Sequence, residues 1–152
     1  MCAQVPCSSK GIEMDQIEAL VIKDECQSVS LKFGRLQDAR RHDELAGLLT
    51  PDATYVRLGE ELALENFIEW ITTTPPNKTR HFVTPTEVEI LDENTAQGLT
   101  YYTIYLYGGD EGPPYPLEGP FVVGEYHEQF ARTNDGWKIK RREARIIFRK
   151  PN

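Results

Sequence analysis

The sequence predicts an α+β domain in which the helices come first and an antiparallel sheet follows. Apolar residues recur at helical spacing in the first half of the chain, until Pro75 and Pro76 interrupt the pattern. Four β-rich runs then follow, and short turn sequences join two pairs of them. Helices and strands that occupy separate parts of a chain are typical of this class.

Three helices are expected before the sheet. The first is a long amphipathic helix over residues 13–40, since no proline interrupts its apolar spacing. A short second helix over residues 43–49 has Asp43 as a candidate N-cap and stops before Pro51. A strand at 53–59, ending at a glycine, precedes the third helix at 60–74.

The strands of the sheet are expected at 79–91, 95–107, 121–133 and 136–149. Turn residues separate the first two strands and the last two. The interval 108–120 is rich in glycine and proline, which indicates a long irregular loop of the kind that often forms a lid or a binding surface.

Length and charge restrict the organisation and the partners. The 152 residues suit one domain, and we expect a flexible tail at 1–11 and a single domain at 12–150. A net charge of -7 argues against a nucleic-acid partner, which would require a basic face. No apolar run approaches the roughly 20 residues of a membrane helix, and no secretory signal is recognisable.

The cysteines Cys2, Cys7 and Cys26 are odd in number and lack the spacing of metal ligands. A disulfide framework is therefore not expected, and a reducing compartment, the cytoplasm, fits best. The three histidines likewise show no zinc spacing, so no metal site is predicted.

Alternation along the strand from residue 121 places one acidic residue on the buried face. Its inward positions are Val122, Gly124, Tyr126, Glu128 and Phe130. A buried carboxylate is costly unless it is paired, so Glu128 belongs either to a site or to a structural pair with an arginine. The basic run at 138–142 is interpreted mainly as a solvated strand face, with anion binding by one arginine as the alternative.

His81, near the start of the first sheet strand, is the histidine best placed for chemistry. Strict alternation from Val88 would turn Phe82 inward and His81 outward. An inward His81 requires a shift of parity, and Pro85 is the place where we expect one, because proline is tolerated at bulges.

Four motifs in this order resemble the SnoaL-like branch of the nuclear-transport-factor-two-like superfamily. They are residues 33–38 with 45–53, Arg80-His81-Phe82-Val83, residues 124–128, and residues 135–139 with Arg142. The resemblance implies a cone of three helices packed in a strongly curved, mixed or antiparallel sheet that encloses a pocket. Members include scytalone dehydratase, lindane dehydrochlorinase and polyketide cyclases, and many others have no catalytic role.

The resemblance further implies that Asp38 orients His81, which acts as the base. A carboxylate on one ring nitrogen leaves the other nitrogen free as a base and stabilises the imidazolium once it forms. The chain departs from the family pattern at Phe33, often a tyrosine, at Pro85, often an asparagine, and at Glu128, more often an aspartate. From the residues alone, Asp38 could instead pair with a nearby arginine, and His81 could be structural.

We therefore expect a cofactor-independent dehydratase, isomerase or cyclase that acts on a hydrophobic cyclic small molecule. Its pocket is expected to be lined or polarised by Phe33, Tyr55, Trp70, Tyr102, Tyr126 and Glu128. The alternatives are a non-catalytic ligand-binding or assembly module and a structural subunit like the β subunit of ring-hydroxylating dioxygenases. The resemblance also implies a homodimer or a higher homo-oligomer.

Overall fold

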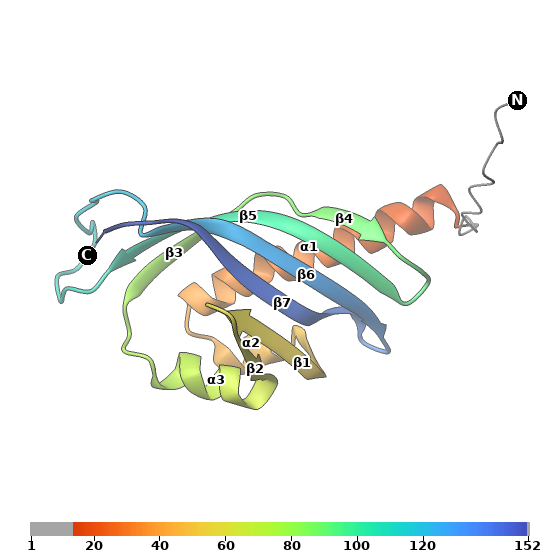
Figure 1. The fold of residues 1–152 in the computed structure, drawn as a ribbon, viewed down its shortest axis with the longest axis horizontal. Coiled ribbons are helices and arrows are strands. Elements are labelled where there is room, and N and C mark those ends of the chain that lie inside the picture. Colours follow the sequence, from red (N-terminus) through yellow and green to blue (C-terminus); the bar gives the residue numbers. More distant parts are fainter. Residues whose placement is uncertain (1–13, 152) are drawn as a thin grey trace, which may run out of the picture.

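The computed structural model describes residues 14–151 and confirms the α+β class, so the tail expected at 1–11 lies outside it. Its elements are α1 (Gln16–Asp38), α2 (His42–Ala46), β1 (Leu49–Arg57), β2 (Glu60–Ala63), α3 (Leu64–Thr73), β3 (Lys78–Val83), β4 (Glu87–Ile90), β5 (Thr95–Tyr107), β6 (Val122–Thr133) and β7 (Gly136–Arg149). In Figure 1, α1 lies along one face of a curved sheet, and α3 lies at one end beside β1 and β2. Among the described helices, none is long and apolar enough to cross a membrane.

The strands form one mixed sheet in the order β2-β1-β7-β6-β5-β3, with β4 also paired to β5. Every pairing is antiparallel except that of β1 with β7, which is parallel. The predicted bounds of β5 and β7 are confirmed, and β6 begins one residue later than predicted.

The prediction of helix over residues 60–63 is wrong, because this segment is β2. Leu58 and Gly59 have φ values of 48° and 81°, and Arg57 pairs directly with Glu60. A two-residue loop with two positive φ angles is the favoured connection of a β-hairpin. The hairpin with β1 thus overrides the helical preference of residues 60–63, and α3 starts at Leu64. Asp43 is not an N-cap either, since α2 begins at His42.

The strand predicted at 79–91 is interrupted at Pro85, as expected. Val83 pairs with Tyr102 and Glu87 pairs with Leu99, so three residues, 84–86, lie opposite two, 100 and 101. The extra residue reverses the alternation. His81 and Val88 consequently point to the same side of the sheet, toward α1. The strict alternation that would bury Phe82 is wrong, because Phe82 is 62% exposed on the opposite face.

A second bulge changes the inward face of β7. Phe130 pairs with Ile139 and Gln129 pairs with Arg141, so Lys140 has no partner of its own. Ile139 and Arg142 therefore both point inward, and Arg142 is fully buried. The interpretation of the basic run as a solvated face holds for exposed Lys140 and is wrong for Arg142.

A hydrophobic core lies between the helices and the sheet, beside a smaller buried cluster of Tyr102, Val122 and Tyr126. It includes residues of α1, α2, α3 and most strands, namely Ile22, Cys26, Phe33, Leu45, Leu49, Tyr55, Phe67, Ile71, Val88, Phe130, Trp137 and Ile139. Burial raises the pKa of the Cys26 thiol to about 12, with smaller contributions from nearby carboxylates. This thiol therefore stays protonated at neutral pH.

Candidate active site

His81 and Asp38 form a buried pair between β3 and the last residue of α1. His81 Nδ1 lies 2.6 Å from Asp38 Oδ1, and the two side chains are 4% and 10% exposed. The backbone N–H of His81 donates to Asp38 Oδ2 at 2.8 Å, and Thr79 Oγ1 donates to Asp38 Oδ1 at 2.8 Å. Both carboxylate oxygens are thus fixed by β3, and the ring of His81 is fixed by the carboxylate.

The contact determines which ring nitrogen of His81 carries the proton when the ring is neutral. Burial by itself raises the pKa of Asp38, but the hydrogen bonds from His81 and Thr79 and the charge of His81 outweigh it and leave the pKa below its ordinary value. An ionised carboxylate only accepts hydrogen bonds, so the proton of the neutral ring lies on Nδ1. Nε2 then carries the lone pair of a base.

The neighbouring Arg40 and Arg41 do not form an ion pair with Asp38. Arg40 donates to the carbonyl oxygens of Thr72 and Thr74, and Arg41 pairs with Glu44. The alternative in which Asp38 pairs with a nearby arginine at the surface is therefore wrong.

Gly34 of α1 leaves space for the side chain of His81. It lies one turn before Asp38, and a Cβ added to it would be 3.1 Å from His81 Cβ and 3.3 Å from Val83 Cγ2. Contacts this short require the neighbours to move. A glycine at this position therefore lets β3 approach α1 closely enough for Asp38 to reach the histidine.

We predict that Gly34→Ala lowers the free energy of unfolding despite the better helix propensity of alanine. The propensity gain is about 1 kcal/mol, whereas overpacking costs about 1–3 kcal/mol, so a net loss of up to about 2 kcal/mol is expected. Urea unfolding followed by circular dichroism measures it, with the exposed α1 substitution Lys32→Ala as the control. A Gly34→Ala chain more stable than the unchanged one would contradict the close approach.

A small hollow opens beside His81. Its volume is about 130 Å³, and it lies among the C-terminal ends of α1 and α3 and the edge formed by β3 and β5. Its lining includes Gln37, Arg40, His42, Trp70, Ile71 and Leu106. Burial and the charge of Arg40 lower the pKa of His42, while Asp43 opposes this shift. Gln37 Oε1 is buried without a hydrogen-bond partner in the part of the chain that the structure describes.

Of the six residues predicted to line the pocket, Trp70 lines this hollow. Four others are buried in the interior as two aromatic pairs: Phe33 stacks with Tyr55 at 6.2 Å between ring centroids, and Tyr102 stacks with Tyr126 at 4.0 Å. Burial raises the pKa of each of these three tyrosines above its ordinary value.

The sixth, Glu128, is paired with Arg142 in the interior. Arg142 Nε and Nη2 donate to Glu128 Oε1 at 2.9 and 2.5 Å, and both side chains have no exposed area. Ser30 Oγ donates to Glu128 Oε2 at 2.7 Å and accepts from Arg142 Nη2 at 2.9 Å. Thr100 Oγ1 also donates to Glu128 Oε2, at 3.1 Å. The alternative of a structural pair with an arginine is confirmed.

Aromatic rings enclose this ion pair on both sides. The guanidinium carbon of Arg142 lies 3.9 Å from the ring centroid of Phe33 and 4.4 Å from that of Tyr126. Such contacts favour a desolvated cation. The basic run at 138–142 gives no sign that Arg142 is buried, but the buried carboxylate of Glu128 requires a cation nearby and could have indicated it.

A long helix packed against a curved, mixed sheet defines an α+β cone fold. The chain belongs to the family of SnoaL-like domains, whose family model matches residues 18–143. No protein with a curated description matches it.

Solved structures support the same fold. A scytalone dehydratase-like protein of Novosphingobium aromaticivorans is 19% identical with a TM-score of 0.75, covering 91% of this chain and 92% of that one. An NTF2-like protein with a cystatin-like fold from the same organism is 19% identical with a TM-score of 0.74, covering 87% and 86%. A type 2 hexachlorocyclohexane dehydrochlorinase is 13% identical with a TM-score of 0.74, covering 91% and 93%. At these identities the likeness shows the shared fold.

Proposed function

We propose that the protein is a cofactor-independent enzyme that moves a proton on a cyclic small molecule, as a dehydratase, isomerase or cyclase. The observation that carries the proposal is the 2.6 Å contact between His81 Nδ1 and Asp38 Oδ1 next to a hollow that His81 lines. His81 is the general base through Nε2, and Asp38 is a positioning residue that holds the tautomer and stabilises the imidazolium. The dehydratase and dehydrochlorinase names among the similar structures support an elimination.

In a dehydration, His81 Nε2 accepts the proton from a carbon next to a carbonyl group. The electrons of the C–H bond form the new double bond, and the hydroxyl group on the neighbouring carbon leaves. The imidazolium returns its proton to the departing oxygen, which leaves as water. No electron acceptor is needed, so the step balances with the substrate and His81 alone.

The hollow restricts the size of the substrate. Its volume of about 130 Å³ is comparable to an engineered apolar cavity of about 150 Å³ that holds benzene. Trp70 and Ile71 provide apolar surface beside His81. We therefore propose a single-ring hydroxy-ketone, or a larger molecule of which one ring reaches His81.

The test is proton exchange and elimination on single-ring ketones and β-hydroxy-ketones in D₂O, followed by NMR. The unchanged chain should exchange or eliminate faster than buffer, and His81→Gln should lose that rate by about 10²–10⁴-fold, the usual contribution of a general base. The matched control is His127→Gln, because His127 Nε2 also lies 2.9 Å from a carboxylate oxygen, that of Glu125, but on a partly exposed strand face. This control should keep the rate.

Two results would contradict the proposal. If no ketone reacts faster than in buffer, the chain is not this enzyme. If His81→Gln remains folded and retains the rate, a group other than the histidine is the base.

The second candidate is a non-catalytic ligand-binding or assembly module. The observation that favours it is the filled interior, where Phe33, Tyr55 and the Glu128–Arg142 pair occupy buried positions between α1 and the sheet. A module of this kind would bind a cyclic ketone in the hollow without exchanging its protons. The same NMR experiment separates the two candidates, since binding shifts the ligand resonances and turnover changes their intensities.

A further inference from the structure

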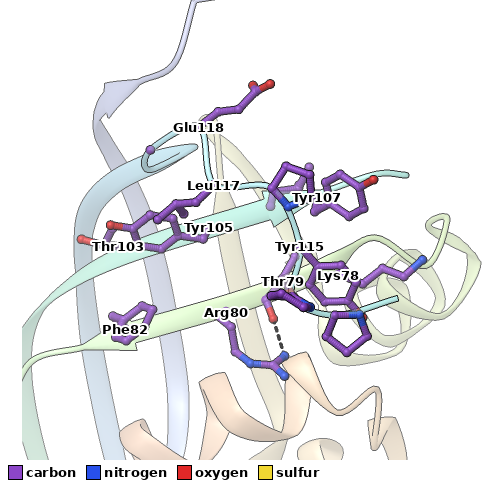
Figure 2. A pocket seen from close by; sticks show the side chains of 15 residues that line it. Lys78, Thr79, Arg80, Phe82, Thr103, Tyr105, Tyr107, Tyr115, Leu117 and Glu118 are labelled. Atoms are coloured by element: carbon purple, nitrogen blue, oxygen red, sulfur yellow. Dashed lines mark hydrogen bonds between the residues drawn. The ribbon is translucent and has the colours of Figure 1, made fainter. Parts of the chain in front are cut away.

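A second and larger hollow lies on the opposite face of the sheet. Residues 78, 80 and 82 of β3 alternate with residues 79 and 81, so they face away from Asp38. They pair with Tyr107, Tyr105 and Thr103 of β5, and with the proline-rich segment 113–119 they enclose a groove of about 640 Å³. Figure 2 shows Phe82, Arg80 and Lys78 along one strand, with the tyrosines beside them.

Several contacts hold the segment over the sheet. Tyr115 stacks on Tyr107 with ring centroids 5.3 Å apart. Lys78 Nζ donates to the carbonyl oxygen of Gly109 at 3.0 Å, and Glu118 pairs with Lys150. Tyr115 and Glu118 therefore fix this segment at two points, and the contact of Lys78 with Gly109 fixes the loop just before it.

The groove combines aromatic surface with positive charge. Neither Lys78 nor Arg80 has a carboxylate within ion-pair distance in residues 14–151, and Arg80 Nη1 donates only to the neighbouring carbonyl oxygen of Thr79. The one acidic lining residue, Glu118, is neutralised by Lys150. Two cations without an ion-pair partner at the groove favour an anionic ligand at this place.

We propose that this groove binds an aromatic carboxylate at a site separate from the dyad. The ring would lie against Phe82, Tyr105 and the stacked Tyr107, and the carboxylate would accept hydrogen bonds from Arg80 and Lys78. Arginine recognises a carboxylate in a bidentate manner, and a flat ring packs well on aromatic side chains. The volume of about 640 Å³ lies in the range of small-molecule sites, roughly 300–1,000 Å³.

The test uses 2-naphthoate as the probe and isothermal titration calorimetry as the measurement. We expect one saturable site and at least about tenfold weaker binding of the neutral analogue 2-naphthylmethanol, because the ionic hydrogen bonds are absent. The double substitution Lys78→Gln with Arg80→Gln should weaken 2-naphthoate binding by about tenfold or more. The matched control removes two exposed lysines of α1, by Lys23→Gln with Lys32→Gln, and should bind as the unchanged chain does.

A third variant separates this site from the proposed active site. His81→Gln should bind 2-naphthoate unchanged, since His81 faces the other side of the sheet. Loss of binding in His81→Gln, equal binding of the neutral analogue, or unchanged binding in the Lys78 and Arg80 double variant would each overturn the proposal.

A second copy of the chain on this face is the other outcome that would overturn it. Light scattering would then show a dimer that Phe82→Asp dissociates, and 2-naphthoate would fail to bind the dimer. A chain that binds 2-naphthoate with the same affinity at low and high protein concentration supports the small-molecule site.

Discussion

Glu128→Gln should lower the free energy of unfolding by about 3–5 kcal/mol, the range for removing one partner of a buried ion pair. The substitution keeps the shape of the side chain but leaves the guanidinium of Arg142 buried without a counter-charge. Ser30 and Thr100 also lose a charged acceptor. Urea unfolding at pH 7, followed by tryptophan fluorescence, gives the difference.

The loss should be partly reversed by a second change. Arg142→Met removes the cation and leaves an apolar chain between Phe33 and Tyr126, so Glu128→Gln with Arg142→Met should cost less than the two single losses added together. The control is Glu118→Gln, which breaks the solvent-exposed pair with Lys150 and should hardly change the denaturation midpoint. Additive losses in the double variant would show that the buried pair is not coupled.

Much of the fold can be predicted because its signals are local. The amphipathic spacing of α1 needs no information from the rest of the chain, and it locates the helix to within three residues at its start. The hairpin between β6 and β7 is predicted by Asp135-Gly136, and Gly136 has a φ of 97°, which such a turn favours.

The faces of the strands are harder to predict because each bulge reverses them. Pro85 marks the first bulge in the sequence, so the inward orientation of His81 could be expected as a shift of parity. Nothing in the sequence marks the second bulge at Lys140, and therefore the burial of Arg142 could not be inferred from alternation.

The candidate site likewise combines features that the sequence predicts with features that depend on distant contacts. His81 and Asp38 could be named as a pair, but their contact depends on Gly34, whose missing side chain gains its meaning only when β3 lies against α1. The groove on the opposite face arises from pairing between β3 and β5 and from the stacking of Tyr115 on Tyr107. Such contacts join residues distant in the chain, and no local pattern encodes them.

Asp38→Asn should lower the free energy of unfolding at neutral pH by about 1.5–3 kcal/mol, the range for hydrogen bonds to a charged group. It should also reduce any activity by about 10³–10⁴-fold, as for the orienting aspartate of a catalytic triad, because the amide no longer selects the Nδ1–H tautomer of His81. Nitrogen-15 NMR of the imidazole ring reports that tautomer directly. A variant that keeps both the tautomer and the rate would show that Asp38 does not position the ring.

The stability difference between Asp38→Asn and the unchanged chain should depend on pH in one direction. The pKa of Asp38 is lower in the folded chain than its ordinary value of 3.8, so the ionised carboxylate favours folding. This stabilisation is complete above the unfolded-state pKa and is lost as the pH falls through the folded-state pKa. The difference in the free energy of unfolding should thus shrink as the pH falls below about 4. Urea unfolding of both chains at each pH measures it, and the other carboxylates cancel because both chains contain them. A difference that persists unchanged to the lowest pH at which both chains fold would mean that the charge of Asp38 contributes nothing, and that only the shape of its side chain holds His81.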